Sequence, residues 1–590
     1  MSGFVGWYNN FSDIDVHKKT IKKMNKTLNT IGNKNNYYIS KNILLGYNEK
    51  ITKYKDYTIV YSGRLYGADE LKKDLIEKGF EFDTNSDDEI ILKGYVHYKE
   101  KILDLLEGVY SFAIYDGNKV FLARDRLGFK PLFYTVVDNN LIFSSEIKGI
   151  LAHPLVDKII NIQGLTEILS LSPSRIPSSG IFKNIYEVKP AHYIVFKKSI
   201  KEKRYWNVTN KISHETFEEC TSNVRNILEN SIKKQMKGKI GTLLSGGIDS
   251  SIITAVCSNE YQKANKKLNT YSLDYEGNDK FFSKNEYQVS RDNYYIDLMK
   301  NKYGTNHKNY CLSQRKLAST LKQAVVARDL PGMADIDSSL YSFSKKIRKH
   351  NKIVLSGEGA DEIFAGYPWF YKEVVHESFP WIKNINKRES LLNKDIRKKM
   401  NLKEFNKKYY LKTIEDVPKV KDEKEQYYKN LFYLNMVWFG PALLERKDRM
   451  TRGANLEARV PFCDHNLIEY LWNVPWEYKS YGGTEKGLLR EAFKDLLPEE
   501  IVDRKKNPFP KTHNPKYSKI VCSLLKKRLR NKNSILYKIF DINKINELIS
   551  TRGESYKTPW FGQLMSGPQL IAFIYQIDIW AELYNIKFEI

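Results

Sequence analysis

The strongest chemical signal in the sequence is a glycine-rich run, Ser245-Gly246-Gly247-Ile248-Asp249-Ser250-Ser251, directly after the apolar stretch GTLL. Its two glycines allow a close backbone approach, and the turn opens a helix whose free N–H groups can bind an anion. The hydroxyls and amides would hold a pyrophosphate, and Asp249 could bind a magnesium ion. The Walker-type lysine is missing, so the run does not indicate a kinase-like loop. A glycine-rich turn that only packs is the alternative.

A second run, LSGEGADEIFAGY, follows the apolar stretch KIVL. It places the carboxylates of Glu358, Asp361 and Glu362 on one short loop, and Gly357 and Gly359 free its backbone. Carboxylates that face a polyphosphate need metal between them, so the run predicts second-magnesium and substrate-orienting groups. A solvated acidic turn is the alternative, but such turns rarely follow an apolar strand.

The elements around these runs change along the chain. Up to about residue 206, short β-branched or aromatic stretches such as YTIVYSG (57–63) and VYSFAIYDG (109–117) predict strands, with helices near 68–78 and 88–98. From residue 214, strands alternate with helices, which predicts a parallel sheet with ligands at the carboxyl ends of its strands. Beyond about residue 380 the pattern is mainly helical, and the lysine-rich segment 383–425 is given no function.

Composition sets outer limits on the function. At 590 residues the chain should form two or more domains. Its net charge of +26 comes from lysines scattered throughout, without a nucleic-acid motif, so it does not predict nucleic-acid binding. Five widely spaced cysteines argue against disulfides or zinc and for a reducing compartment. The N-terminus resembles neither a signal peptide nor an anchor, and apolar runs stay below membrane-spanning length, so we expect a cytoplasmic protein.

Three further motifs complete a pattern with the two loops: RKDRMTRGANLEARVPFCDH (446–465), TEKGLLREAF (484–493) and RKKNPFPKTHNP (504–515). Together they resemble the glutamine-dependent asparagine synthetases. The first part resembles the glutaminase domain of that family through GVYSFAIYD, ARDRLGFKPLFY and FSSEIKGIL. The resemblance implies an α+β N-terminal nucleophile-type sandwich over residues 1–207. An α/β ATP-pyrophosphatase (PP-loop) domain with a helical C-terminal part would follow over residues 208–590.

For the second domain, the resemblance implies adenylation chemistry with ATP and Mg²⁺ as cofactors. An acceptor carboxylate would attack the α-phosphate, release pyrophosphate and leave an acyl-adenylate that an amine opens. Lys486 would neutralise phosphate charge in the transition state. Arg446 and Arg449 match basic family positions, with surface ion pairs to Asp448 or Glu457 as the alternative. Asp292 could be a further metal carboxylate.

The implied active-site residues fall into three groups. Lys486, Glu358 and Arg449 would be catalytic, and Asp249 and Asp361 would bind metal. The nucleotide and its pyrophosphate would be bound by Leu244, Ser245, Gly246, Gly247, Asp249, Ser250, Ser251, Leu273 and Gly357.

The first domain departs from the family at most of the positions that bind or attack glutamine. Ser2 replaces the nucleophilic cysteine, and the stretches at 31–34 and 46–49, the latter with Asn48, lack the glutamine-binding arginines. The family's Asn-Gly-Glu motif is Ser62-Gly63-Arg64, and only Asp87 is retained. Losing one oxyanion donor alone slows hydrolysis by about 100- to 1000-fold. We therefore predict that glutamine hydrolysis is lost; an engineered change would explain Ser2 but not the other positions.

The acceptor is less defined. Where the family carries an arginine thought to face aspartate, this chain reads Met333-Ala334-Asp335-Ile336-Asp337-Ser338-Ser339. Two acids there would repel a dicarboxylate and suit a neutral or cationic acceptor. Alternatively, Asp337 and Ser338 only cap the following helix.

The predicted function is therefore that of an ATP-dependent, AMP-forming ligase that amidates a carboxylate, aspartate foremost, with ammonia. A β-lactam synthetase-like ligase or cyclase that uses another carboxylate and amine is the alternative, and a non-catalytic regulatory protein is the third. Expected partners are a small-molecule carboxylate and ammonia or an amine, with no nucleic acid and no membrane. A homodimer and an external ammonia source are left open.

Overall fold

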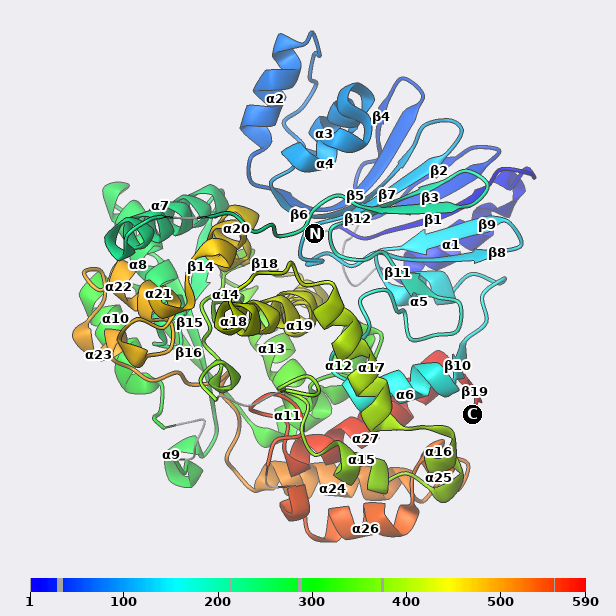
Figure 1. Ribbon diagram of the computed structural model, residues 1–590. Coiled ribbons are helices and arrows are strands. Elements are labelled where there is room, and N and C mark those ends of the chain that lie inside the picture. The colour runs from blue at the N-terminus through cyan, green and yellow to red at the C-terminus, as the bar shows by residue number, and fades with distance from the viewer. Residues whose placement is uncertain (1, 29–34, 213, 285–288, 373–375, 557) are drawn as a thin grey trace. The chain divides into compact units, whose positions relative to one another are not determined.

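The computed structural model describes residues 2–28, 35–212, 214–284, 289–372, 376–556 and 558–590. These residues cluster into two compact units (Figure 1): a smaller one of Met1–Asn161 and Ile176–Asn207, and a larger one of Ile162–Arg175 and Val208–Ile590. The larger unit takes in a segment that the sequence assigned to the first domain. The reason is that helix α6 (Ile162–Leu171) packs on α15 (Ile385–Ser390) and α17 (Leu402–Glu415).

The smaller unit contains two antiparallel six-stranded sheets, ordered β11-β8-β9-β1-β3-β2 and β13-β12-β7-β6-β5-β4. Its strands are β1 (Phe4–Asn9), β2 (Asn36–Ile39), β3 (Ile43–Tyr47), β4 (Thr52–Tyr54), β5 (Tyr57–Leu65), β6 (Gly108–Tyr115), β7 (Val120–Arg124), β8 (Phe133–Val137), β9 (Asn140–Ser144), β10 (Ile159–Asn161), β11 (Tyr186–Glu187), β12 (His192–Phe196) and β13 (Ile200–Arg204). Its helical segments are η1 (Asp15–His17), α1 (Lys18–Lys26), α2 (Ala68–Glu77), α3 (Asp87–Tyr98), η2 (Lys99–Lys101), α4 (Ile102–Leu105) and α5 (Ile147–Leu151).

The layers of the smaller unit follow from its two apolar clusters. One cluster joins side chains of both sheets, including Phe4, Leu45 and Phe143 from the first and Ala113 and Leu122 from the second. The other lies between the second sheet and helices α2, α3 and α4. Helices α1 and α5 pack on the outer face of the first sheet. The unit is thus a four-layered sandwich, with helices outside two stacked sheets.

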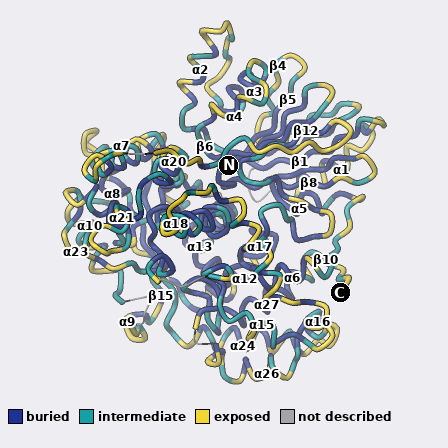
Figure 2. Tube along the Cα trace, viewed as in Figure 1, coloured by how far each residue is buried: buried dark blue, intermediate teal, exposed yellow. Residues whose placement is uncertain are grey.

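The larger unit is built around a parallel sheet in the order β16-β15-β14-β17-β18. Its strands are β14 (Ile240–Leu243), β15 (Asn269–Tyr275), β16 (Asn306–Leu312), β17 (Ile353–Leu355), β18 (Glu457–Arg459) and β19 (Lys587–Glu589). Figure 1 shows helices α7 (Phe217–Gln235), α8 (Ile248–Lys263) and α10 (Asn293–Tyr303) along one side of the sheet, and α13 (Ala334–Ile347) and α19 (Gly440–Gly453) along the other. In Figure 2, the first half of α8 is buried, whereas α7 and α10 expose their outer faces.

Helical segments make up the rest of the larger unit, in agreement with the pattern beyond residue 380. They are α9 (Asn278–Phe281), α11 (Gln314–Ser319), α12 (Leu321–Arg328), α14 (Ala360–Ile363), η3 (Pro368–Phe370), α16 (Lys394–Lys399), α18 (Glu423–Leu434), η4 (Asn435–Phe439), η5 (Pro461–Cys463), α20 (His465–Asn473), α21 (Trp476–Lys479), η6 (Tyr481–Gly483), α22 (Gly487–Phe493), α23 (Glu499–Val502), α24 (Lys516–Arg528), α25 (Leu536–Ile539), α26 (Ile542–Ser550), η7 (Glu554–Tyr556) and α27 (Gly567–Tyr584). Within the described ranges, no helix is both long enough and apolar enough to cross a bilayer.

Candidate active site

The two loops singled out in the sequence meet at one point of the parallel sheet. Strands β14 and β17 are neighbours, but the chain continues from β14 toward β15 and β16 on one side and reaches β17 and β18 on the other. Such a reversal of strand order opens a crevice at the carboxyl ends of the strands. Both loops begin there, and a Cβ added to Gly357 would lie 2.8 Å from the Asp249 Cβ. The fold therefore presses the glycine-rich loop against the carboxylate loop.

A cavity of about 210 Å³ lies at this crevice. Most of the predicted nucleotide, metal and catalytic residues line it: Leu244, Ser245, Asp249, Ser250, Leu273, Gly357, Glu358 and Asp361. Gly246, Gly247 and Ser251 belong to the same loop but are not among the lining residues. Lys486 is not among them either and reaches the site through its contacts with Asp249 and Asp361. The sequence motifs thus converge on one concave site.

The glycine-rich loop is shaped as an anion-binding turn. Gly246 has a φ of +69°, and a Cβ there would lie 2.5 Å from the Tyr295 Cβ, so glycine is required. The Ser245 and Ser250 hydroxyls lie 3.1 Å apart, and Ser250 also donates to the Gly247 carbonyl at 3.0 Å. Helix α8 begins at Ile248, so its first N–H groups face the loop. This arrangement suits a phosphate group at the start of α8.

Lys486 bridges two of the predicted metal carboxylates. Its ammonium lies 2.6 Å from both oxygens of Asp249 and 2.6 Å from Asp361. Burial opposes the charge, but the two carboxylates outweigh it and raise the pKa of Lys486 above its usual range. The Lys486 backbone is left-handed, with a φ of +59°, a strained conformation that the surroundings must hold in place. A Cβ at Gly366 would come within 2.5 Å of the Lys486 Cε, so this glycine leaves room for the bridge.

Glu358 is held ionised between two cations of helix α19. Its carboxylate accepts from Arg446 at 2.5 Å and lies 2.8 Å from the Lys447 ammonium. Burial raises the cost of its charge, but Lys447 and Arg446 lower the pKa of Glu358 to about 2. All three side chains line the cavity. Arg446 is therefore paired inside the site, and not with Asp448 or Glu457 at the surface as the alternative had it.

The RKKNPFPKTHNP motif, whose individual roles the sequence did not resolve, contributes Lys506 to the cavity lining and places Arg504 beside it. Lys506 pairs with Asp361, and Arg504 lies 2.6 Å from Asp292. Together with Lys486, Lys506 lowers the pKa of Asp361 to about 2, against the effect of burial. Asp292 lines the cavity, but it is held by an arginine, so a metal-binding role for it would require Arg504 to move.

Another part of the cavity lining is largely apolar and aromatic. It consists of Tyr367, Phe439, Leu443, Phe509, Pro510, Phe561, Gly562, Gln563 and Leu564. Tyr367 donates to Glu362 at 2.6 Å, and its ring lies 5.0 Å from that of Phe439. No motif in the sequence indicated the segment 561–564 as part of the site.

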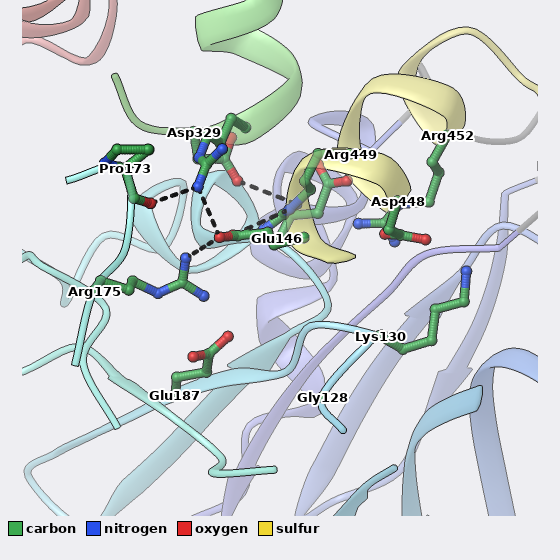
Figure 3. Close-up of polar contacts among 12 residues, drawn as sticks. Gly128, Lys130, Glu146, Pro173, Arg175, Glu187, Asp329, Asp448, Arg449 and Arg452 are labelled. Carbon is green, nitrogen blue, oxygen red and sulfur yellow. Dashed lines mark hydrogen bonds and ion pairs between the residues drawn. The ribbon is translucent and has the colours of Figure 1, made fainter. Parts of the chain in front are cut away.

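Arg449, expected to be catalytic, does not line the cavity among the described residues. It is 1% exposed, and its guanidinium lies 3.8 Å from both Asp329 and Glu445 (Figure 3). Glu445 also pairs with Arg175 and, at 3.3 Å, with Arg328. The buried arginines lower the pKa of Glu445 to about 2, against the effect of burial. This position corrects the sequence-based assignment: Arg446, one turn earlier, is the arginine at the cavity.

The two acids of the 333–339 stretch are buried in structural contacts. Helix α13 begins at Ala334, earlier than expected, and Asp337 accepts from the Met333 backbone at 2.8 Å. Asp337 also lies 3.7 Å from Arg328, and Asp335 accepts from Gln569 at 3.0 Å. Met333 is the member of this stretch that lines the cavity. The two acids thus do not line the cavity, and Asp337 and Ser338 lie inside α13, so they are not its N-caps either.

Four of the six positions that were compared with the family's glutaminase site are Ser2, Ser62, Arg64 and Asp87, and Ser2 lies at the start of β1 in the smaller unit. Ser2 donates to the Tyr61 carbonyl at 2.8 Å, and Ser62 donates to the Ser2 carbonyl at 2.8 Å. The Asp87 carboxylate accepts from the Leu65 backbone at 2.9 Å, and the Arg64 guanidinium lies 3.8 Å from it.

The remaining positions are fixed by backbone contacts. A Cβ at Gly63 would lie 2.3 Å from the Val109 carbonyl, so the strand pair requires glycine there. The Asn48 side chain donates to the Leu28 carbonyl at 2.9 Å. The stretch at 31–34, where the family would carry an arginine, lies outside the described residues.

Comparison with known proteins matches both parts of the chain. A family model described as asparagine synthase matches residues 223–582, and one described as a glutamine amidotransferase domain matches residues 1–206. The chain is 42% identical to asparagine synthetase (glutamine-hydrolyzing) 3 of Bacillus subtilis strain 168, over 100% of both chains. It is 28% identical to asparagine synthetase (glutamine-hydrolyzing) 1 of the same strain, over 86% of this chain and 87% of that one. Asparagine synthetase (glutamine-hydrolyzing) of Gallus gallus is 28% identical, over 78% of this chain and 73% of that one. The matches confirm the predicted fold class, a nucleophile-type sandwich followed by a PP-loop domain with a helical C-terminal part.

Proposed function

Because the chain belongs to the asparagine synthetase family, we propose that this carbon–nitrogen ligase converts aspartate to its amide with ATP and ammonia, without hydrolysing glutamine itself. The aspartate side-chain carboxylate attacks the α-phosphorus of ATP, and the bond to pyrophosphate breaks. Ammonia then attacks the carbonyl carbon of the acyl-adenylate, loses a proton, and AMP leaves. The observation that carries this proposal is the cavity at the strand-order reversal, where the glycine-rich loop, Glu358 and the carboxylates bound by Lys486 meet.

The residues of the phosphate end have complementary tasks. The backbone around Ser245–Gly247 and the start of α8 bind the leaving pyrophosphate, and Lys486 neutralises the charge that develops on it. Lys506 adds a second ammonium at the same carboxylate, Asp361. These cationic and dipolar groups would together stabilise the charge of the polyphosphate, an arrangement that lowers the barrier to pyrophosphate departure.

A magnesium ion fits the donor set at this end. Asp249 and Asp361 present oxygen ligands within 2.6 Å of the same ammonium, so they lie close enough to share one cation. No group of three or more potential protein ligands is assembled within the described residues, and Mg²⁺ is usually bound by one or two carboxylates plus substrate phosphates and waters. Asp249 and Asp361 would hold it, and when bound it supplies charge neutralisation for the triphosphate.

Glu358 positions the reacting groups. Its pKa of about 2 keeps it ionised, so its carboxylate accepts hydrogen bonds from ammonia and does not donate a proton. Arg446 and Lys447 fix its orientation from helix α19. A fixed acceptor next to the reacting carbonyl aligns the ammonia lone pair and stabilises the positive charge that nitrogen gains on attack.

The charges of the smaller unit support the loss of glutamine hydrolysis. Asp87, the one retained family ligand for the glutamine ammonium, already accepts from Tyr61 at 3.2 Å and faces Arg64. An ammonium group would meet the Arg64 cation there, which is a repulsive contact. Ser2 carries a hydroxyl in place of a thiol, and a hydroxyl is the weaker nucleophile near neutral pH.

Pyrophosphate release tests the ligase proposal directly. The protein is supplied with ATP, Mg²⁺ and one of several carboxylates, and ammonium is compared with glutamine as nitrogen source. We expect pyrophosphate, AMP and asparagine with aspartate plus ammonium, and asparagine at background level with glutamine. If another carboxylate releases pyrophosphate and aspartate does not, the acceptor is wrong. If no carboxylate does, the adenylation chemistry is wrong.

A further inference from the structure

A tight turn near the C-terminus contributes to the lining of the cavity. The Trp560 backbone donates to the Met565 carbonyl at 2.7 Å, which closes the turn. Gly562 donates to the Trp381 carbonyl at 2.8 Å, and the Phe561 ring stacks on Phe439 at 5.6 Å. The turn is therefore anchored on both sides, and its tip, Gly562–Leu564, lines the cavity. A group carried on this tip has a fixed position relative to the site.

Gln563 is the polar side chain on that tip. It is half-buried and lines the cavity, and among the described residues its amide has no hydrogen-bond partner. The charged side chains of the same cavity are already paired: Arg446 and Lys447 with Glu358, and Lys506 with Asp361. Gln563 thus retains both donor and acceptor capacity for a ligand.

We assign the turn that carries Gln563 to the binding of the acceptor and not of the nucleotide. In phosphoryl transfer the attacking and leaving oxygens lie in line, on opposite sides of the phosphorus. The pyrophosphate side is the glycine-rich loop and Lys486, so the acceptor carboxylate approaches the α-phosphorus from the side away from them. Phe439, Phe509 and the turn line the same cavity, and we assign them to the acceptor.

Resting on the function proposed above, we propose that Gln563 determines acceptor specificity. Its amide oxygen accepts from the α-ammonium, and its NH₂ donates to the α-carboxylate, of an amino acid whose side-chain carboxylate is adenylated. A neutral amide can bind both halves of a zwitterion, whereas a charged side chain would repel one of them. The apolar walls around it raise the cost of leaving either half unpaired, which favours aspartate over acceptors that lack one group.

Two variants test this assignment in the full-length protein. Gln563→Met keeps the length of the side chain and removes both hydrogen bonds, and Gln563→Glu keeps an acceptor but adds a negative charge. Gln163→Met, at an exposed glutamine of α6, is the matched control. Pyrophosphate release is measured with aspartate, with succinate, which lacks the amino group, and with β-alanine, which lacks the α-carboxylate.

We expect Gln563→Met to raise the KM for aspartate by about 10- to 100-fold, with kcat and the KM for ATP changed less than about threefold. Its preference for aspartate over succinate and β-alanine should shrink by a similar factor. Gln563→Glu should lose more activity with aspartate than with β-alanine. If Gln563→Met leaves the aspartate KM and the preference unchanged, or raises both KM values equally, the assignment is overturned while the ligase proposal stands. Wild-type protein that releases no pyrophosphate with aspartate overturns the proposed function instead.

Discussion

Lys486→Met should lower both the stability of the larger unit and the rate of adenylate formation, and a second substitution should separate the two effects. Without the ammonium, Asp249 loses its bonds to Lys486, and Asp361 keeps only Lys506. Removing one partner of a buried ion pair typically costs about 3–5 kcal/mol, because the other charge stays buried. Loss of a preorganised cation at the leaving group should slow adenylation by about 100- to 1000-fold.

The double variant Lys486→Met, Asp249→Asn removes the stranded charge as well. We expect it to recover at least half of the lost unfolding free energy, as measured by urea unfolding, while pyrophosphate release stays low. Lys494→Met is the matched control, because that lysine is 60% exposed and pairs with a partly exposed glutamate. A rate that recovers together with the stability would refute a direct catalytic role for Lys486. An unchanged urea midpoint in the single variant would refute the bridging account.

Three further predictions concern the rest of the chain. Burial lowers the pKa of Lys479 to about 7, whereas the lysine of the unfolded chain keeps its proton up to about pH 10. The buried ammonium therefore lowers the free energy of unfolding most below pH 7, where the folded protein must also carry the charge. Lys479→Met should therefore raise the free energy of unfolding by about 4 kcal/mol at pH 6 and by much less at pH 10. An equal increase at both pH values, measured by urea unfolding, would contradict this. Ser2→Cys should release no glutamate from glutamine, and neither should Ser2→Cys with Arg64→Glu, so activity in the first would show that the pocket still binds glutamine. Glu445→Gln should destabilise by about 3 kcal/mol in the same assay while the KM for ATP stays unchanged, because the residue pairs with buried arginines outside the cavity.

The nucleotide half of the site could be predicted from sequence because its information is local. The loop at 245–251 directly follows a strand and opens a helix, so the order of residue types fixes both its backbone shape and its place at the sheet edge. The loop at 356–362 follows β17 in the same way. The motifs did not predict that Lys486 links the two loops, because Lys486 and Asp249 are 237 positions apart in the chain.

The assignments that were wrong or missing depend instead on contacts between residues far apart in the chain. Helix α19 carries Arg446, Lys447 and Arg449 within four positions, and only its packing decides which of them reach the cavity. Gln563 enters the site because its turn pairs with residues near Ile382, far away in the chain. No local sequence pattern predicts either of these positions. In the same way, packing and not a local pattern places Ile162–Arg175 with the larger unit.

The two sites of this chain differ in how their charges are balanced, and the difference bears on function. In the smaller unit, the ion pair between Arg64 and Asp87 costs little desolvation free energy, because the Arg64 side chain is 41% exposed. The Asp87 carboxylate also accepts hydrogen bonds from Tyr61 and Leu65, so it is neutralised and hydrogen-bonded without any ligand. In the larger unit, Lys486 is 3% exposed and is held in a strained backbone conformation between two carboxylates. Buried ion pairs contribute little net stability and are costly to assemble. A fold gains nothing from keeping such an arrangement around an open cavity unless the charges serve a ligand. The buried charges around Lys486 are therefore the ones that we propose serve a ligand, whereas Arg64 and Asp87 neutralise each other within the smaller unit.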